Sequence, residues 1–484
     1  MTIKELEPKI VWNNFYELTR RPRPSKHEEK VREFLLQWGK DHGIETFADK
    51  TGNVIFRKPA TPGYENRRGV IFQGHMDMVP QKVASSDHNF ETDPIETEII
   101  GEWVGAKGTT LGADNGMGIA LGMSILESND IKHGPVEVLV TYDEETGMTG
   151  ATSLEAGVLK GDILINLDSE TEGELCIGCA GGLDCEAEFK YAPEAVPAGC
   201  KGLKVRVKGL QGGHSGMDIA LYRGNANKIV ANAILPLIEK YGAKMLDFTG
   251  GSLRNAIPFE AEALLAVPAD AKAKCVKAAK KSLADSKECY KDSDPSMEYF
   301  VEDAPLKPKA IETAVAVNAM KAIIACPSNV VRMSQSMPGL TETSNNLAIV
   351  RCGRGKIEIK SLMRSSLNSS KAELANVLKY IFEFAGAKVK FVGGYSGWLP
   401  RPELAINGVM ADTYKKMFGK EMKVFATHGG LECAIMGATY PAWEMTSIGP
   451  TIVHPHSPDE RVNIESVGQV WNYLKAVLEE IPCK

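Results

Sequence analysis

An apolar stretch that ends in three consecutive acids constrains this chain more than any other sequence feature. Val136-Glu137-Val138-Leu139-Val140 is rich in β-branched residues and predicts a buried strand. Asp143, Glu144 and Glu145 follow almost directly, and no Lys or Arg lies nearby in the sequence to pair with them. Carboxylates at the end of a core strand are costly unless something positive meets them. A bound cation is the simplest partner, and a solvated acidic loop is the alternative.

The same order, a strand followed by a chemically active residue, recurs in the first part of the chain. The stretch 69–74 predicts a strand that leads to His75, and 162–167 predicts one that leads to Asp168. Between them, a glycine-containing loop carries Asp114 ahead of a predicted helix. Strands that alternate with helices predict an α/β domain with a mainly parallel central sheet flanked by helices. In such sheets functional groups collect at the carboxyl ends of the strands.

The composition changes after residue 183. From 184 to 397 no further acids cluster at strand ends, and two stretches share a pattern that is consistent with an internal duplication. We therefore expect residues 184–397 to form an inserted α+β domain. Residues 1–183 and 398–484 would be the two parts of the first domain.

The N-terminal region predicts two helices, over residues 8–21 and 25–42. The second begins with Ser25-Lys26-His27-Glu28, which has the pattern of a capping box. Apolar residues then recur at helical spacing, so we expect one face of this helix to be buried.

Composition excludes several classes of protein. The chain has 484 residues, too many for one core, and its formal net charge of -6 without a basic stripe argues against nucleic-acid binding. No apolar run approaches the ~20 residues that cross a membrane, and no apolar signal core begins the chain, so we expect a cytoplasmic protein. The ten cysteines are scattered, as is typical of free thiols, and the single CxxC pair lacks the second pair of a structural zinc site.

Several histidines lie in Gly- or Pro-rich loops beside polar residues. They are His75, His214, His428, His454 and His456. His75 and Asp77 are two residues apart, so in an extended chain they point the same way and Asp77 can orient the imidazole. Imidazoles and carboxylates without converging thiolates suit Zn, Mn or Co, and their number here fits two ions that share a carboxylate. Spacing alone allows either His454 or His456 to reach a metal.

The candidate residues belong to motifs that occur in the same order in a known family. The motifs are Gly74-His75-Met76-Asp77, Gly112-Ala113-Asp114-Asn115-Gly116, Asp143-Glu144-Glu145-Thr146-Gly147, Asp168 after its strand, Gly212-Gly213-His214-Ser215-Gly216 and His456-Ser457-Pro458-Asp459-Glu460. Together they resemble the dinuclear-zinc exopeptidases of the carboxypeptidase-G2, aminoacylase and carnosinase group, and in particular its dipeptidase branch. The resemblance spans nearly the whole chain. It implies a zinc-exopeptidase-like fold in which the inserted domain is a lid.

The resemblance implies five metal ligands. His75 and Asp168 would bind one Zn²⁺, Glu145 and His456 would bind the other, and Asp114 would bridge the two. Mn²⁺ and Co²⁺ are alternatives. The Ser-Pro-Asp-Glu sequence that follows selects His456 over the histidine two residues earlier. The peptide bond after Asp114 is expected to be cis.

The resemblance also implies catalytic and substrate-binding residues. Asp77 would orient His75, and Glu144 would be the general base that activates a water between the metals and later protonates the leaving amine. His214 would stabilise the charge that develops on the scissile carbonyl. Arg364 would bind the free carboxylate of a dipeptide through its two-pronged guanidinium. The substrate-binding set would be His214, Asn255, Arg364, Gly429 and Gly430.

The implied activity is the hydrolysis of unblocked dipeptides, including Xaa-His dipeptides. An N-acyl amino acid amidohydrolase of the same fold would share every metal ligand, but the long inserted domain favours the dipeptidase. A binding protein with an inactive site is disfavoured because the expected base, Glu144, is present. Small dipeptides are the expected partners, with no nucleic acid or membrane, and the family contains both monomers and homodimers.

Overall fold

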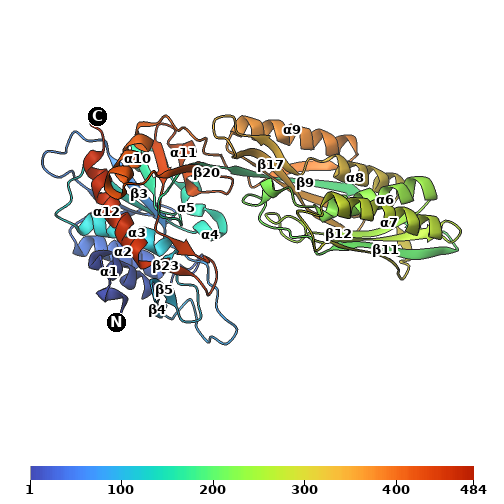
Figure 1. Ribbon diagram of the computed structural model, residues 1–484, viewed down its shortest axis with the longest axis horizontal. Helices are drawn as coiled ribbons and strands as arrows, with labels where there is room; N and C mark the ends of the chain where they lie inside the picture. The colour runs from blue at the N-terminus through green and yellow to red at the C-terminus, as the bar shows by residue number, and fades with distance from the viewer. Residues whose placement is uncertain (1) are drawn as a thin grey trace. The chain divides into compact units, whose positions relative to one another are not determined.

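The computed structural model describes residues 2–484, which form two compact units. The first unit contains residues 2–178, 400–426 and 431–484, and the second contains residues 179–399 and 427–430. Both chain ends belong to the first unit (Figure 1). The short segment 427–430 therefore packs with the inserted part of the chain, although the sequence pattern placed it in the first domain. Within residues 2–484, no helix has the length and apolar character that crossing a membrane would require.

The first unit is built on an eight-stranded sheet with the strand order β1-β2-β6-β3-β7-β21-β8-β20. The central strands β6, β3, β7 and β21 are parallel, and antiparallel pairs extend the sheet on both sides. The predicted α/β class with a parallel centre is confirmed. The elements of this unit are η1 (Ile3–Glu5), α1 (Lys9–Thr19), α2 (Glu29–Asp41), β1 (Glu45–Ala48), β2 (Val54–Lys58), β3 (Val70–His75), β4 (Thr97–Ile100), β5 (Trp103–Ala106), α3 (Ala113–Glu127), β6 (Val136–Thr141), α4 (Glu144–Gly147), α5 (Thr149–Ser153), β7 (Ile163–Asn166), β8 (Glu174–Cys179), α10 (Ala405–Phe418), β20 (Lys423–Thr427), α11 (Glu432–Thr439), β21 (Glu444–Ser447), β22 (Ile452–Val453), β23 (Arg461–Asn463) and α12 (Ile464–Glu480).

The strands that carry the candidate site are buried along their whole length. Every residue of β3, β6 and β7 is buried, which explains why these strands are apolar runs rather than alternating ones. Small residues let α3 approach this sheet closely. A Cβ on Gly118 would lie 2.6 Å from the carbonyl oxygen of Leu167, and one on Gly122 would lie 3.0 Å from Val138.

A second, four-stranded sheet with the order β22-β23-β5-β4 positions the turn that carries His456. Strand β23 pairs with both β22 and β5. Strands β4 and β5 form a hairpin in the segment between β3 and α3. This hairpin joins the C-terminal segment to the first part of the chain.

The start of the second helix differs from its prediction. Helix α2 begins at Glu29, and the side chain of Ser25 does not cap it. Instead, Ser25 Oγ donates a hydrogen bond to Asp77 Oδ2 at 2.8 Å, and Glu28 Oε1 accepts one from the backbone N–H of Lys26 at 2.9 Å. A tertiary hydrogen bond has therefore replaced the local cap.

The second unit contains a sheet with the order β14-β11-β13-β12-β17-β18-β9-β19, to which β16 adds by pairing with β17. Helices α6, α7, α8 and α9 lie side by side on one face of it (Figure 1). The elements are β9 (Gly181–Lys190), β10 (Glu194–Ala195), β11 (Cys200–Lys208), η2 (Ile219–Leu221), α6 (Ala226–Tyr241), β12 (Lys244–Gly250), β13 (Ala261–Pro268), α7 (Lys272–Cys289), β14 (Glu298–Asp303), β15 (Lys309–Ala310), α8 (Thr313–Ala325), β16 (Asn329–Met333), β17 (Thr341–Gly353), β18 (Lys356–Ser365), α9 (Asn368–Phe384) and β19 (Lys388–Val392).

The topology of the second unit repeats, as the sequence pattern indicated. One half runs β11-α6-β12-β13-α7-β14, and the other runs β9-α8-β17-β18-α9-β19. The corresponding strands occur in the same spatial order, β14-β11-β13-β12 in one half and β19-β9-β18-β17 in the other. The first half is inserted between β9 and α8 of the second, and the halves meet where β12 pairs with β17.

The junction between these halves depends on Gly251. Its φ is +68°, and a Cβ there would lie 1.8 Å from the carbonyl oxygen of Ala348 in β17. We predict that Gly251→Ala lowers the free energy of unfolding by about 2–4 kcal/mol, because a backbone clash adds to an unfavourable φ. Gly353→Ala is the control, because a Cβ at Gly353 meets nothing within 4 Å. Urea denaturation measures both variants, and a change below about 0.5 kcal/mol in Gly251→Ala would contradict the prediction.

Candidate metal centre

Side chains from five segments of the first unit converge at the carboxyl ends of the central strands. His75 is the last residue of β3, and Asp168 follows β7 by two residues. Glu145 lies in α4, directly after β6, and Asp114 lies in the first turn of α3. His456 lies in the turn between β22 and β23.

Asp114 lies between the two histidines. Its Oδ1 is 3.0 Å from His75 Nε2, and its Oδ2 is 3.0 Å from His456 Nε2. His75 Nε2 is also 3.3 Å from Asp168 Oδ1, and His456 Nε2 is 3.1 Å from Glu145 Oε1. The five residues therefore form two groups, each with one imidazole and one carboxylate, that share Asp114. The peptide bond after Asp114 is cis, as expected.

The raised pKa values of side chains in this cluster indicate that it holds more negative charge than its own side chains balance. Hydrogen bonds to Asp114 and Glu145 raise the pKa of His456 to about 11. Although burial opposes it, the carboxylates around His75, Asp168 foremost, raise the pKa of that imidazole well above its ordinary value. Burial raises the pKa of Asp168 to about 6. Metal ions supply the same positive charge without protons, and a set of imidazoles and carboxylates fits Zn, Mn or Co.

The histidine two residues before His456 takes no part in this cluster. His454 is exposed, and its backbone carbonyl accepts a hydrogen bond from Ser457 Oγ at 3.0 Å. The structure thus separates two histidines that spacing alone could not distinguish.

Asp77 supports both His75 and the turn after β6. Its Oδ1 lies 3.3 Å from His75 Nδ1, which directs the other ring nitrogen toward Asp114 and Asp168. The backbone N–H groups of Glu144 and Glu145 donate to Asp77 Oδ1 and Oδ2 at 2.9 and 3.1 Å. One buried carboxylate therefore sets the position of a ring and of a turn.

Asp143, to which the sequence assigned no role, shapes the same turn. Its φ is +51°, and its two carboxylate oxygens accept hydrogen bonds from the hydroxyl groups of Thr146 and Thr149. Asp143 thereby holds the start of the short helix α4, which carries Glu144.

Glu144 is next to Glu145 in the chain and is not one of the five converging residues. Burial raises the pKa of Glu144 well above its ordinary value of 4.5, and the charges of Asp168 and Glu432 add to this effect against that of His75. A carboxylate with a raised pKa can accept a proton near neutral pH and release it again.

Sequence reasoning missed Glu432, a fully buried acid at the start of α11. Its Oε2 accepts hydrogen bonds from Gln73 Nε2 and Thr141 Oγ1, both at 2.6 Å. Asn166 Nδ2 donates to Gln73 Oε1 at 2.6 Å, so polar side chains tie together the ends of β3, β6 and β7. A polar residue near the end of each apolar strand was the available signal.

In the second unit, His214 is held as a single tautomer. Its Nδ1 accepts the backbone N–H groups of Gly216 and Met217 at 3.2 and 3.1 Å, so the ring proton lies on Nε2. Burial and the nearby charge of Arg364 lower the pKa of His214, which keeps the ring neutral. His214 Nε2 lies 3.5 Å from Arg364 Nη2. Because both atoms carry protons, neither can accept a hydrogen bond from the other, and each can donate to a ligand.

Arg364 is buried on β18 without a carboxylate at ion-pair distance among residues 2–484. Its Nε donates to Ser215 Oγ at 3.3 Å, and it interacts with the hydroxyl of Tyr395. The nearby Asp184 pairs instead with Arg254, at 3.1 Å. A buried guanidinium in this state can receive a carboxylate from a ligand.

The other three candidates of the second unit are less closely grouped. Asn255 is exposed, and its backbone carbonyl accepts the N–H of Ser215 at 2.8 Å. The N–H of Gly429 donates to Thr427 Oγ1 at 3.0 Å, so this group is already engaged. Gly430 packs against Tyr395, whose hydroxyl oxygen would lie 2.8 Å from an added Cβ.

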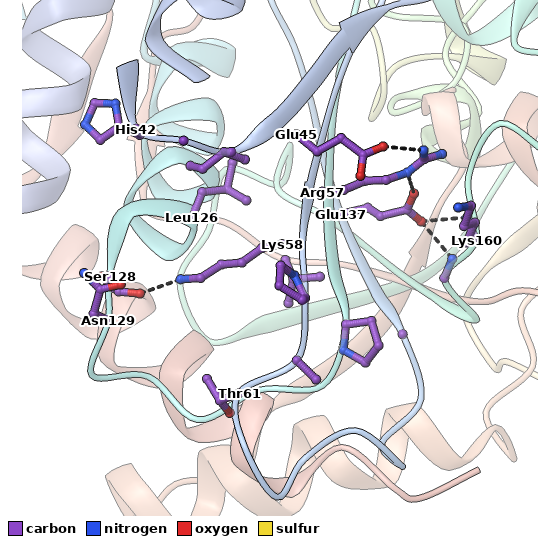
Figure 2. A pocket seen from close by; sticks show the side chains of 18 of the residues that line it. His42, Glu45, Arg57, Lys58, Thr61, Leu126, Ser128, Asn129, Glu137 and Lys160 are labelled. Atoms are coloured by element: carbon purple, nitrogen blue, oxygen red, sulfur yellow. Dashed lines mark hydrogen bonds and ion pairs between the residues drawn. The ribbon is translucent and has the colours of Figure 1, made fainter. Parts of the chain in front are cut away.

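A large cavity of the first unit lies away from the candidate metal centre. It has a volume of about 920 Å³ and is lined by the end of β2 and the start of β6, at the opposite edge of the sheet. Several of its charged side chains have partners within the pocket, as Figure 2 shows. Arg57 pairs with Glu45 and Glu137, and Lys58 donates to the carbonyl of Ser128. None of the five converging side chains lines it.

Comparison with known proteins identifies the family. Residues 71–480 match the model of peptidase family M20/M25/M40. The chain belongs to this peptidase family. The family resemblance predicted from the motifs is therefore confirmed.

Individual members of the M20 family are similar to this chain over its whole length. It is 41% identical, over 486 aligned residues, to the cytosol non-specific dipeptidase of Escherichia coli strain K12, covering 100% of this chain and 99% of that protein. The crystal structure of aminoacylhistidine dipeptidase from Vibrio alginolyticus superimposes with a TM-score of 0.94 at 42% identity, covering 100% of this chain and 99% of that one. Aminopeptidase PepT from Bacillus cereus shares the fold, with a TM-score of 0.58 at 17% identity over 98% and 99% of the two chains.

His428 makes the stability of this M20-family chain sensitive to acid. It is 6% exposed, and its Nε2 lies 2.7 Å from Ser344 Oγ. Burial, with the charge of Arg364, lowers the pKa of His428 to about 3. The unfolded chain takes up a proton near pH 6.5, whereas the folded chain does not. The contribution of this group to stability is therefore complete above about pH 6.5 and is lost as the pH falls toward 3.

We predict that His428→Asn loses less stability than the wild type between pH 7.5 and pH 5, by about 2 kcal/mol. Urea denaturation at both pH values measures the difference. His27→Asn, at an exposed position, is the control and should behave as the wild type. Equal acid sensitivity in His428→Asn and the wild type would show that His428 is not held neutral.

Proposed function

We propose that this chain is a two-metal dipeptidase that hydrolyses unblocked dipeptides, including Xaa-His dipeptides. The observation that carries the proposal is the carboxylate of Asp114 between two groups of one imidazole and one carboxylate, with Glu144 beside them. The names of the two full-length relatives, a dipeptidase and an aminoacylhistidine dipeptidase, support the substrate class. A cytoplasmic location, which the name of the Escherichia coli relative supports, is part of the proposal.

The metal ligands are proposed from the two groups. His75 and Asp168 would hold one ion, Glu145 and His456 the other, and Asp114 both. Zn²⁺ is the proposed metal, and Mn²⁺ and Co²⁺ suit the same donors. When bound, such ions supply the Lewis acidity that polarises a carbonyl and makes water acidic.

Glu144 would act as the general base and then as the general acid. Its raised pKa lets it take a proton from the attacking water and return it to the leaving amine. Asp77 would act through other residues, because it keeps the Nε2 lone pair of His75 directed at the ligand cluster and holds the backbone of Glu144 in place.

The second unit would bind the substrate. The Nε2–H of His214 would donate to the carbonyl oxygen that gains negative charge, and Arg364 would bind the free carboxylate of the dipeptide. Asn255, Gly429 and Gly430 complete the proposed substrate-binding set. The N–H of Gly429 is engaged by Thr427, so we assign the carboxylate-binding N–H to Gly430.

We predict that Glu144→Gln retains both metal ions and loses about 10³-fold in kcat, because an amide cannot accept the proton. Elemental analysis and hydrolysis of an Xaa-His dipeptide measure the two effects. Glu155→Gln, at an exposed glutamate that pairs with Lys50, is the control. Turnover within tenfold of the wild type would show that Glu144 is not the base, and loss of metal would show that it is a ligand.

A substrate panel separates the dipeptidase from an N-acyl amino acid amidohydrolase with the same metal ligands. We predict that free dipeptides are cleaved fastest, and that amidation of their carboxylate lowers kcat/KM by about 10- to 100-fold, as for a lost charged hydrogen bond. Arg364→Lys should lower kcat/KM for free dipeptides and change that for the amides little, whereas Arg354→Lys, in an exposed turn, should change neither. Faster hydrolysis of N-acetyl amino acids than of dipeptides would favour the amidohydrolase.

A further inference from the structure

The segment 22–25 lies beside the metal centre although it precedes residues 71–480, the part of the chain that matches the family. Its backbone pairs with the chain just beyond His75. The N–H of Met78 donates to the carbonyl of Arg23 at 3.1 Å, and the N–H of Ser25 donates to the carbonyl of Met78 at 3.3 Å. The side chain of Arg23 is only 2% exposed.

The guanidinium of Arg23 links two segments that carry candidate ligands. Its Nη1 donates to the carbonyl oxygens of Met76 and Asp77 at 3.1 and 3.0 Å, directly after His75. Its Nη2 donates to the carbonyl oxygen of Gly112, two residues before Asp114. One buried cation therefore ties the end of β3 to the loop before α3.

Two glycines make room for this side chain. A Cβ on Gly112 would lie 2.6 Å from Arg23 Nη2, and a Cβ on Gly116 would lie 2.5 Å from it. Gly112 also has a φ of +71°, which a residue with a side chain rarely adopts. The glycines that flank Asp114 are thus explained by the guanidinium that the loop surrounds.

Glu460 holds the same loop from its other side. Its Oε2 accepts the backbone N–H groups of Leu111 and Gly112 at 2.8 and 2.9 Å, and its Oε1 accepts that of Asp114 at 3.2 Å. Glu460 is 2% exposed and follows His456 by four residues. Gly112 is therefore fixed through its carbonyl by Arg23 and through its N–H by Glu460.

We propose that Arg23 and Glu460 form a positioning pair that sets the spacing of the segments carrying His75, Asp114 and His456 before metal binds. The inference rests on the proposed function, because it takes these three residues as metal ligands. Without the pair, the backbone that carries the mutually repelling carboxylates of the site would not be held in place. Residues that support metal ligands in this way typically contribute 10- to 100-fold to metal affinity. Arg23 acts through backbone atoms and is not a catalytic residue.

Arg23→Lys tests the pair, because an ammonium keeps the charge but cannot span both segments as a guanidinium does. We expect the affinity for Zn²⁺ and Co²⁺, measured by competition with a chelating dye, to fall at least about tenfold. The visible absorption spectrum of the Co²⁺ form should also change, because the ligand geometry is altered. Arg21→Lys is the matched control, since Arg21 lies two residues earlier and pairs with the partly exposed Glu17.

Glu460→Gln is the second variant, and it keeps the shape of the side chain while removing its charge. It should weaken metal binding in the same direction, with far-UV circular dichroism that matches the wild type. Both variants binding metal within twofold of the wild type would overturn the proposed pair, even if their thermal unfolding midpoints fall. The proposed function has a separate readout: if His75→Ala leaves the metal content of the wild type unchanged, the ligand assignment itself is wrong.

Discussion

Buried negative charge at the carboxyl ends of the central strands is the constraint on which the rest of the first unit depends. Asp77, Asp114, Asp168 and Glu145 each lie within a few ångströms of an imidazole, and carboxylates in such a buried site are costly unless they are paired. Apolar strands bring these groups together, because the sheet must be buried on both faces. The surrounding structure then directs donors at the acids, among them the backbone N–H groups that point at Asp77 and Glu460.

The second unit has the opposite charge at its candidate residues, and its duplicated topology explains how they meet. His214 follows β11, in the inserted half, whereas Arg364 lies on β18, in the other half. Their contact therefore depends on the β12–β17 junction that joins the two halves into one sheet. Neutral His214 and charged Arg364 together offer N–H donors. Within the described residues, no carboxylate of this unit lies at ion-pair distance from the guanidinium. This arrangement suits a ligand that brings its own negative charge.

The sequence was informative where a residue's role is set by its own strand or motif. His75, Glu145 and Asp168 follow apolar strands, so both the strands and the residues after them could be predicted. Arg23 and Glu432 could not, because their roles are set by partners far away in the sequence. Arg23 contacts Gly112 across 89 residues, and no local pattern marks that contact. Ser25 shows the same limit. Its sequence pattern predicted a helix cap, but its hydroxyl donates a hydrogen bond to the distant carboxylate of Asp77 instead.

The residues that support the candidate metal centre come from both ends of the chain, so the centre is complete only when the two ends have folded together. Arg23 comes from the N-terminal segment, and Glu460 reaches Leu111 across 349 residues, after the complete second unit has been inserted. A chain that ended before residue 400 would contain His75, Asp114, Glu145 and Asp168 but neither His456 nor Glu460. It would carry four of the five proposed ligands, and the loop before Asp114 would keep its contact with Arg23 but lose the one with Glu460. The return of the last 85 or so residues to the first unit therefore supplies both His456, a proposed ligand, and Glu460, whose carboxylate accepts the backbone N–H groups beside Asp114.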